Sequence, residues 1–585
     1  MSDTKPAESS LYETLLAGAG LPDVPHGRLR DSASVVLWRH APGAVSGEPR
    51  PIEVFWVQRS PALRFMGGWH AFPGGALDPA DVTEVDENKD PVQVAGTFEA
   101  PSRHLGPPFR GDPDQVAGTS HPASLTASVL ARTDFGPDLV PGLELCALRE
   151  LFEETGVASL DGLSSRTSID ATTRDRLEAA RQGLLEHGGS LQEALATMGL
   201  RPDPSRLVFA GRWRTPPFTP VRFDNRFFLL HWPQAEPLQP QIVPGELSSG
   251  EWIDPETALD AWRHGDVITA PPILHILRVL AAEGPEAGLP RLRSTEEARL
   301  GPFRRFEFRP GVITLPLVTP TLPPAAHTNA FLVGHGEVVL IDPGSPLPDQ
   351  QQALLEALAA ARSQGLRLRA IWLTHHHPDH VGAVDAIRTA LGVPVLAHPA
   401  TAARLAVPGP TSGPFARAAV QVDGLLHHDQ RITLAGSPDM TLRVLHTPGH
   451  APGHLCFLDE ATGSVLAGDL VAGLGTIVID PPDGDMTGYL ASLEAVAGLA
   501  PKVLFPAHGP PLFDAVGHLE ELKRHRLWRE EKIRTAWQEG VRELAALVER
   551  VYPGLDPRAK PLAERQVTGH LERVLAARGP EPAQK

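Results

Sequence analysis

The chain has 585 residues, of which 42% are hydrophobic and 21% charged, and its formal net charge is −17. This length exceeds what one hydrophobic core supports, so the sequence predicts several domains. This excess of negative charge argues against binding to nucleic acid or to an anionic membrane through overall electrostatic attraction.

The two cysteines, Cys146 and Cys456, lie far apart among apolar residues, which is typical of buried thiols in a reducing compartment. The N-terminal stretch lacks the basic and apolar pattern of a secretion signal. No run of about 18 apolar residues occurs, so no membrane span is expected. These features predict a cytoplasmic protein without a membrane partner.

The front half is predicted to form one α/β unit over 31–285, preceded by a flexible polar tail at 1–30. An amphipathic helix is expected over 143–156, where Gly156 ends the apolar spacing. A closing helix is expected at 270–284. The predicted strands of this unit are 32–40, 52–60, 206–216 and 226–233.

The segment 286–308 loses periodicity and gains proline, glycine and charge, which predicts a linker. Strand and helix patterns then alternate over 309–515, as they do in an α/β domain. The remaining residues, 516–585, carry mostly helical spacing and are predicted to form a separate C-terminal domain.

The segment "WLTHHHPDHVG", Trp372 to Gly382, places histidines and an aspartate directly after an apolar strand. Imidazole suits zinc, manganese or iron, and a neighbouring carboxylate can hold a second ion or steer a water molecule. Further candidate ligands each follow another apolar strand, so all of them can meet at one edge of the sheets. The candidates are His375, His377, Asp379, His380, His450, Asp469 and His508.

This pattern resembles the HxHxDH motif of the metallo-β-lactamase superfamily, and the likeness covers roughly residues 310–515. The resemblance implies an αββα sandwich with two Zn²⁺ or Mn²⁺ ions that hydrolyses an ester, thioester, lactam or phosphodiester. It implies one metal on His375, His377 and His450. It implies a second metal on Asp379, His380 and His508, with Asp469 bridging and Asp379 also catalytic. The other histidines nearby are expected to support the ligands or the fold; they are His376, His398, His446 and His454.

The C-terminal segment 516–585 resembles the small winged-helix appendage of one branch of that superfamily, which includes a single-strand ribonuclease. Two roles stay open for it. It can be a helical packing module that shapes the metal cleft, or a module that binds single-stranded RNA, which the net charge does not support.

A second chemical pattern occurs in "RELFEETGV", Arg149 to Val157. Glu150, Glu153 and Glu154 share one helix face, where three like charges repel one another. A solvated acidic face is one interpretation. The other is a site for Mg²⁺ or Mn²⁺, because hard cations prefer oxygen ligands.

The upstream segment "RSPALRFMGGWHAFPGG", Arg59 to Gly75, matches the pattern RSx3Rx3Gx3FPGG, and Arg149 to Val157 matches REUxEExGU. Together they resemble coenzyme A diphosphatases of the Nudix family, which implies an α/β/α sandwich. The resemblance implies that the three glutamates bind Mg²⁺ or Mn²⁺, with Glu150 or Glu153 as base. It implies that Arg149 orients a glutamate and that Gly74 and Gly75 shape the loop. Arg59 and Arg64 are expected either to grip a 3′-phosphate or to form surface salt bridges.

The Nudix box of this chain is interrupted. The family pattern GX5EX7REUXEE is continuous, whereas here Asp81 replaces the first glutamate and an insertion of about 82–142 follows. Asp81 is a doubtful substitute ligand. Glu246 is a further carboxylate candidate, expected instead to position the strand after it.

The sequence thus predicts a bifunctional metallohydrolase, in which the front half cleaves coenzyme A or acyl-CoA and the rear half cleaves an ester, thioester or phosphodiester. In the alternative hypothesis the front half is a non-catalytic nucleotide sensor. It would then regulate a rear hydrolase or single-strand ribonuclease.

Overall fold

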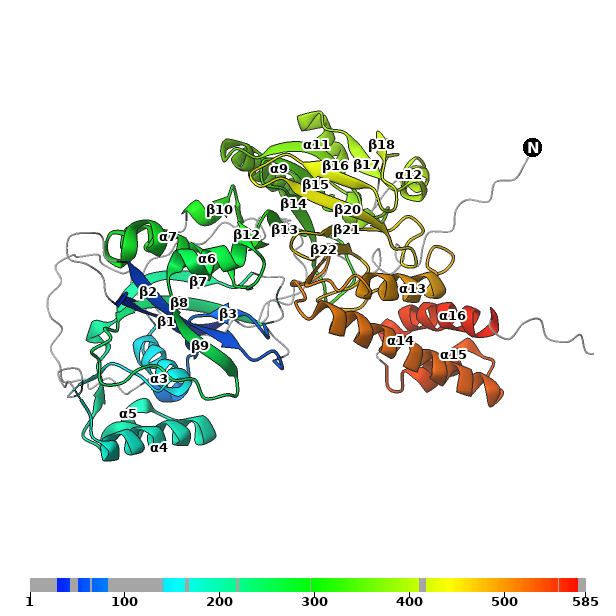
Figure 1. Ribbon diagram of the computed structural model, residues 1–585. Helices are drawn as coiled ribbons and strands as arrows, with labels where there is room; N and C mark the ends of the chain where they lie inside the picture. The colour runs from blue at the N-terminus through cyan, green and yellow to red at the C-terminus, as the bar shows by residue number, and fades with distance from the viewer. Residues whose placement is uncertain are drawn as a thin grey trace, which may run out of the picture.

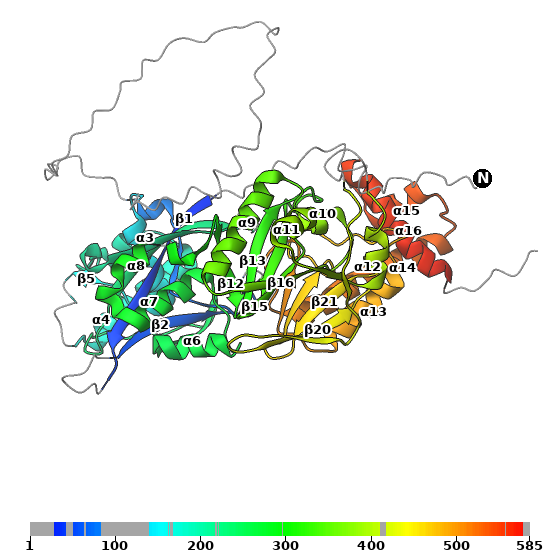
Figure 2. The same ribbon diagram turned by 90° about the horizontal axis from the view of Figure 1, so that it is seen from above.

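The computed structural model describes residues 29–42, 51–63, 66–82, 140–161, 163, 168–216, 219, 221–294, 296–409, 417–555 and 557–576. Residues 1–28 of the predicted tail and most of the predicted insertion lie outside these ranges, whereas Leu29 and Arg30, expected in the tail, already belong to a strand of the front sheet. Figure 2 shows the front domain and the C-terminal helices at opposite ends, with the rear sandwich between them. No helix among the described residues is both long enough and apolar enough to cross a membrane.

The front domain is built on a mixed sheet whose main strand order is β3-β2-β1-β8-β7; β4 also pairs with β1, and β9 with β2. The central strand β1 runs parallel to β8 and antiparallel to β2. The strands are β1 (Leu29–His40), β2 (Ile52–Arg59), β3 (His70–Ala71), β4 (Gly74–Ala76), β7 (Val208–Arg214), β8 (Arg222–His231) and β9 (Leu247–Ile253).

Helices cover both faces of this sheet because successive residues of β1 point to opposite sides. Val35 and Leu37 join one core with α3, while Val36 and Trp38 join another with α6 and α7. Figure 1 shows α6 and α7 on one side and α3, α4 and α5 on the other, which is the expected α/β/α sandwich. The helices are α3 (Leu143–Thr155), α4 (Ala171–His187), α5 (Leu191–Ala196), α6 (Pro255–Arg263) and α7 (Pro271–Ala287); β5 (Leu160–Asp161) pairs with β6 (Arg201–Pro202).

The segment expected to be a linker, 286–308, is packed against both domains in its described parts, 286–294 and 296–308. It forms α8 (Leu289–Arg293), the pair β10 (Arg299–Leu300) and β11 (Phe303–Arg304), and the start of β12 (Phe306–Arg309). Leu292 enters the front core, while Leu300 and Phe303 enter the rear core. Proline, glycine and charge break the periodicity of this segment, but its isolated apolar residues are enough to anchor it.

The rear domain has two sheets packed face to face, one ordered β12 to β18 and the other β19 to β23. Phe331 and Trp372 of the first sheet meet Phe457 and Phe505 of the second in one buried cluster. Figure 1 shows α9 and α11 outside the first sheet and α13 outside the second, so the expected αββα sandwich is present. The strands are β13 (Val312–Val318), β14 (His327–Val333), β15 (Glu337–Ile341), β16 (Arg367–Trp372), β17 (Val395–Ala397), β18 (Gly424–Leu425), β19 (Arg431–Leu434), β20 (Met440–His446), β21 (Leu455–Asp459), β22 (Ser464–Gly468) and β23 (Val503–Pro506). The helices are α9 (Pro348–Ser363), α10 (Pro378–Val381), α11 (Val384–Leu391), α12 (Pro399–Leu405) and α13 (Met486–Ala497).

The two domains share a buried aromatic contact. Trp69 of the front domain packs edge-on against Phe513 and Phe308, with ring centroids 4.4 Å and 5.7 Å away. Trp69 belongs to the apolar cluster between the two rear sheets. In addition, the Trp262 indole donates to the Phe308 carbonyl at 3.0 Å.

The C-terminal region consists of α14 (Ala515–Gln538), α15 (Leu544–Val551) and α16 (Lys560–Ala576). In its described ranges, 515–555 and 557–576, no strand occurs, so the wing of the expected winged-helix domain is not found there. The physical reason is that its apolar residues recur at helical spacing and pack helix against helix, as Leu547, Val548 and Val551 do.

A buried arginine ties these helices to the rear sandwich. Arg526 of α14 is fully buried and donates to the Ile477 carbonyl at 2.6 Å and to Gln566 at 2.9 Å. Its guanidinium also lies 5.5 Å from the centre of the Tyr489 ring.

We expect Arg526→Met to lower the free energy of unfolding by about 2–3 kcal/mol, because it removes the donor to the Gln566 side-chain oxygen and the nearer of two donors to the buried Ile477 carbonyl, which keeps only Gln566 Nε2 at 3.3 Å. Denaturant unfolding followed by circular dichroism measures this change. Arg524→Met is the matched control, since Arg524 is exposed on the same helix. Equal unfolding midpoints for the two variants would contradict the anchoring role of Arg526.

Candidate functional sites

Seven side chains from the ends of four strands meet in one cluster in the rear domain, and all of them are buried except the half-buried His377. They follow β16, β20, β22 and β23, and they are His375, His377, Asp379, His380, His450, Asp469 and His508. Three sets among them could each hold an ion, because the ligand atoms of each set lie within 4.8 Å of one another. The sets are His375, His377 and His450; Asp379, His380 and His508; and His375, His380 and Asp469.

The first set brings three imidazole nitrogens together. His377 Nδ1 lies 2.9 Å from His375 Nε2 and 2.9 Å from His450 Nε2. His450 Nδ1 donates to the Val478 carbonyl at 2.7 Å, which leaves its Nε2 with a free lone pair toward the cluster. Such an arrangement suits a borderline-soft divalent cation.

The second set adjoins the first through Asp469. One Asp469 oxygen lies 3.6 Å from His380 Nε2 and 3.4 Å from His508 Nε2, and the other lies 3.4 Å from His450 Nε2. Asp469 therefore faces both sets, the position that a bridging carboxylate would need. His508 Nδ1 donates to the His327 carbonyl at 3.0 Å, which fixes the ring with Nε2 toward the cluster.

Two observations indicate that this cluster suits divalent cations. His380 Nε2 and Asp469 Oδ1 are buried polar atoms without a hydrogen-bond partner among the described residues. Burial, and then the neighbouring imidazoles, hold the pKa values of His375 and His377 well below the usual range, so both rings are neutral and able to ligate. The fold and the histidine cluster together imply divalent metal binding.

The residue Asp342, which directly follows β15, holds the ligands in place and was missed by the sequence reasoning. Its Oδ2 accepts from His380 Nδ1 at 2.9 Å and from the Thr374 hydroxyl at 2.6 Å, and that hydroxyl lies 2.9 Å from His375 Nδ1. Partners of this kind orient metal-binding imidazoles. In the sequence, Asp342 is recognisable only as an aspartate at the end of the predicted strand in "VVLIDPG". This pattern is common and does not indicate a particular role.

The other histidines take no ligand position in these sets. His376 turns to Asp483 at 3.2 Å, and the rings of His398 and His446 stack on each other at 4.1 Å. His454 Nε2 accepts from the Asp469 backbone N–H at 3.0 Å and so supports that carboxylate.

In the front domain, α3 carries the glutamates and Arg149. The Arg149 guanidinium contacts Asp81 at 2.7 Å and 2.9 Å, and Glu150 and Glu153 both at 3.1 Å. Asp81 is buried, and its oxygens accept from Arg149 and from the Asp78 N–H. Asp81 therefore serves as the partner of Arg149 and not as a metal ligand.

The two ends of the insertion that interrupts the Nudix box lie next to each other in the fold. A Cβ atom on Gly142, which has φ +88°, would stand 2.8 Å from the Asp81 carbonyl oxygen. The chain thus leaves after Asp81 and re-enters beside it, and a long insertion between adjacent ends adds little to the cost of loop closure. The insertion itself, at 83–139, lies outside the described residues.

The glycines Gly74 and Gly75 let β4 pass directly over the glutamates. A Cβ on Gly75 would stand 2.4 Å from the Glu150 carboxylate, so no larger residue fits without displacing it. The Gly74 N–H donates to Glu154 at 2.9 Å, and its own Cβ position is blocked by the Ala33 carbonyl.

The glutamates are crowded and partly buried. Burial raises the pKa of Glu150 to about 7, although Arg149 acts in the opposite direction. Burial, and then the charge of Glu150, raises the pKa of Glu154 well above its usual range, and burial also raises that of Glu153. Hard cations would favour the ionised forms, so the three carboxylates fit Mg²⁺ or Mn²⁺.

Of the two expected phosphate-binding arginines, Arg59 pairs with Glu246 at 3.0 Å. This matches the salt-bridge interpretation of Arg59. Glu246 is mostly exposed, and the charge of Arg59 partly opposes the rise that burial causes in the pKa of Glu154. Arg64 lies outside the described residues.

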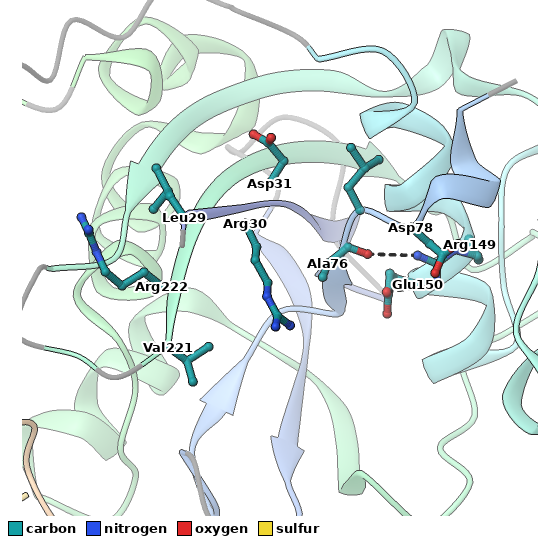
Figure 3. A pocket seen from close by; sticks show the side chains of 10 residues that line it. Leu29, Arg30, Asp31, Ala76, Asp78, Arg149, Glu150, Val221 and Arg222 are labelled. Atoms are coloured by element: carbon teal, nitrogen blue, oxygen red, sulfur yellow. Dashed lines mark hydrogen bonds and ion pairs between the residues drawn. The ribbon is translucent and has the colours of Figure 1, made fainter. Parts of the chain in front are cut away.

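A cavity of about 710 Å³ opens beside Glu150, as Figure 3 shows. Its walls come from β1, β4, the turn after β4, α3 and the start of β8. The lining residues are Leu29, Arg30, Asp31, Ala76, Leu77, Asp78, Arg149, Glu150, Val221 and Arg222. The sequence assigned no role to Arg30 or Arg222, although Arg222 lies in the segment 215–230, which also resembles a Nudix subgroup.

Comparisons with known proteins agree with this geometry. Residues 29–280 match the model of the NUDT19 Nudix domain, and residues 323–508 match that of the metallo-beta-lactamase superfamily. The "Beta-lactamase-like protein 2 homolog" of Drosophila melanogaster is 30% identical over 254 residues, 42% of this chain and 82% of that protein.

Two further matches each cover one domain of the chain. The "Lactamase-like protein adaB" of Aspergillus niger is 31% identical over 244 residues, 42% of this chain, and the match spans 66% of that protein. A crystal structure of a NUDIX hydrolase from Alicyclobacillus acidocaldarius is 25% identical with a TM-score of 0.30, over 43% of this chain and 91% of that one.

Both matched families are hydrolases, and a Nudix domain suggests a small nucleotide derivative as substrate. The chain is therefore a hydrolase that belongs to the metallo-β-lactamase superfamily through its rear domain and carries a NUDT19-type Nudix domain in front.

Proposed function

We propose that this protein is a bifunctional metal-dependent hydrolase. The front domain cleaves the diphosphate of coenzyme A or acyl-CoA, and the rear domain hydrolyses an ester, thioester or phosphodiester. The observation that carries the front assignment is the Asp81–Arg149 ion pair, which assembles the interrupted Nudix box around three glutamates beside a cavity.

In the front domain Glu150, Glu153 and Glu154 would hold Mg²⁺ or Mn²⁺, ions that neutralise charge on phosphoryl oxygens. Glu150 lies in the cavity wall, where its carboxylate would take a proton from the attacking water. Arg149 fixes Glu150 and Glu153. Water adds to phosphorus as the bridging P–O bond breaks, which yields phosphopantetheine and adenosine 3′,5′-bisphosphate from coenzyme A.

In the rear domain His375, His377 and His450 would hold one Zn²⁺ or Mn²⁺, and Asp379, His380 and His508 a second. Such ions supply Lewis acidity and lower the pKa of water. Asp469, between the two sets, would bridge them. Asp379, which accepts from the Thr328 hydroxyl at 3.4 Å, would orient the attacking water.

The choice of rear substrate rests on the fusion alone, since a thioesterase acting on acyl-CoA would share its substrate with the front domain. Single-stranded RNA is the alternative substrate. It has weaker support, because the described C-terminal region lacks a wing and the chain is acidic.

We expect Glu153→Gln to reduce diphosphatase activity by about 10²-fold or more, because it removes a charge that would hold the cation. Mass spectrometry of the products formed from coenzyme A with Mg²⁺ or Mn²⁺ measures this loss. Glu144→Gln is the control, as Glu144 is exposed on the same helix. Binding of coenzyme A by the unaltered protein without cleavage would instead favour the sensor hypothesis.

We expect His377→Ala to remove one metal equivalent from the rear domain and to abolish release of free thiol from acetyl-CoA, while diphosphate cleavage continues. Elemental analysis of the purified protein and a thiol assay measure the two effects. His376→Ala is the matched control, because that neighbouring ring faces Asp483 and not the cluster. Equal metal content in the two variants would overturn the ligand assignment, and an unaltered protein inactive on acetyl-CoA would overturn the thioester assignment.

A further inference from the structure

Helix α3 carries carboxylates at the end where a helix least favours them. The C-terminus of a helix has a partial negative charge, so cations are favourable there and anions are unfavourable. The last turn of α3 contains Glu153 and Glu154 and no basic residue. The charge of Glu150 acts on Glu154 as well and helps to raise its pKa. A cation supplied from outside the helix would therefore stabilise this turn.

Arg181 of α4 supplies that cation. The residue is only 2% exposed, and Figure 1 shows α3 between the sheet and α4. The Arg181 Nε donates to the Glu153 carbonyl at 3.0 Å, and one terminal nitrogen donates to the Glu154 carbonyl at 2.9 Å. The guanidinium thus contacts the main chain of the two residues whose side chains would bind the metal.

These contacts complete the C-terminal end of α3. The last four carbonyls of a helix have no donor within the helix. The Phe152 carbonyl accepts from the Gly156 N–H at 2.8 Å, and the Thr155 carbonyl accepts from the Gln241 N–H at 2.8 Å. The remaining two carbonyls are the ones that Arg181 holds, so all four have a donor.

The same guanidinium holds the segment 232–246, which connects β8 to β9. It donates to the Gln241 carbonyl at 3.1 Å, and the segment continues to Glu246, the partner of Arg59. The carboxylate of Glu178 lies 3.7 Å away and is half exposed, so it is a weak partner for the arginine. Most of the donors of Arg181 are therefore directed at main-chain carbonyls.

Arg181 and Arg149 act on the glutamates in different ways. Arg149 contacts the carboxylates of Glu150 and Glu153, both at 3.1 Å, so it occupies oxygens that a cation would also use. Arg181 contacts only the carbonyls of Glu153 and Glu154 and leaves their carboxylates free. It can therefore fix this turn without competing with a metal ion.

We propose that Arg181 is a positioning residue of the front metal site. By holding the carbonyls at the end of α3, it keeps Glu153 and Glu154 placed to bind Mg²⁺ or Mn²⁺. This proposal rests on the metal-dependent function proposed above. It assigns part of the metal affinity to an arginine that contacts neither the ion nor the carboxylates that would hold it.

The first test measures Mn²⁺ binding by the full chain, through the electron paramagnetic resonance signal of the free ion. The front sites are identified as those that Glu153→Gln weakens. We expect Arg181→Met to weaken the same sites by about tenfold or more, as is usual when a residue that orients a ligand is lost. Arg176→Met is the matched control, because Arg176 lies on the same helix and donates to the Thr197 carbonyl instead of to α3. Equal Mn²⁺ affinities in the two arginine variants would overturn the proposal.

Amide hydrogen exchange in the metal-free protein gives a second readout, which needs neither metal nor substrate. We expect the N–H groups of Glu153, Glu154 and Thr155 to exchange about tenfold faster or more in Arg181→Met than in Arg176→Met, because a turn without its cap opens more often. Matching exchange rates would contradict the capping role.

Arg181→Lys tests the role in a protein that keeps the positive charge. A lysine lacks the planar fork that reaches both carbonyls, so we expect Mn²⁺ to bind about threefold more weakly or worse than in the unaltered protein. An unchanged affinity would show that charge alone suffices and would overturn positioning by the fork. Cleavage of coenzyme A is a separate measurement. An unaltered protein that does not cleave it would overturn the diphosphatase function, while the Mn²⁺ affinities still decide the role of Arg181.

Discussion

Ionisable side chains held away from water constrain both halves of this chain. A buried charge is costly unless a partner of opposite charge or a hydrogen bond compensates it. Arg149 and Asp81 compensate each other in the front domain, and Asp342 accepts hydrogen bonds from His380 and Thr374 in the rear domain. Each of these contacts also fixes the groups beside it. The same interactions that make burial tolerable thus position the glutamates and the imidazoles for their proposed roles.

The sequence identified the rear cluster because each candidate ligand directly follows an apolar strand, and strand ends converge when sheets form. It could not identify contacts that depend on tertiary placement. Asp81 looked like a doubtful ligand because a long insertion separates it from Arg149, although the ends of that insertion meet in space. Asp342 carried no distinguishing signal. The segment 286–308 was predicted to be a linker, since Leu292, Leu300 and Phe303 are too widely spaced to show a period.

The C-terminal helices bear on the rear cluster through a short chain of contacts. Arg526 holds the Ile477 carbonyl, and the next residue, Val478, accepts the hydrogen bond that orients His450. Tyr489, beneath the Arg526 guanidinium, donates its hydroxyl to the Leu470 carbonyl, directly after Asp469. These helices therefore brace the loop after β22, which carries Asp469 and whose Val478 carbonyl orients His450. Such bracing requires neither a wing nor a basic surface.

The Trp69 contact has a consequence for the independence of the two domains. Trp69 lies inside the front motif segment, and Phe513 follows His508 by five positions in the rear domain. Separating the halves would expose the indole and open the apolar space between the rear sheets to water. A shortened chain that carries either domain alone would have to replace this aromatic surface with polar residues. Packing, in addition to the covalent link, therefore holds the two domains together.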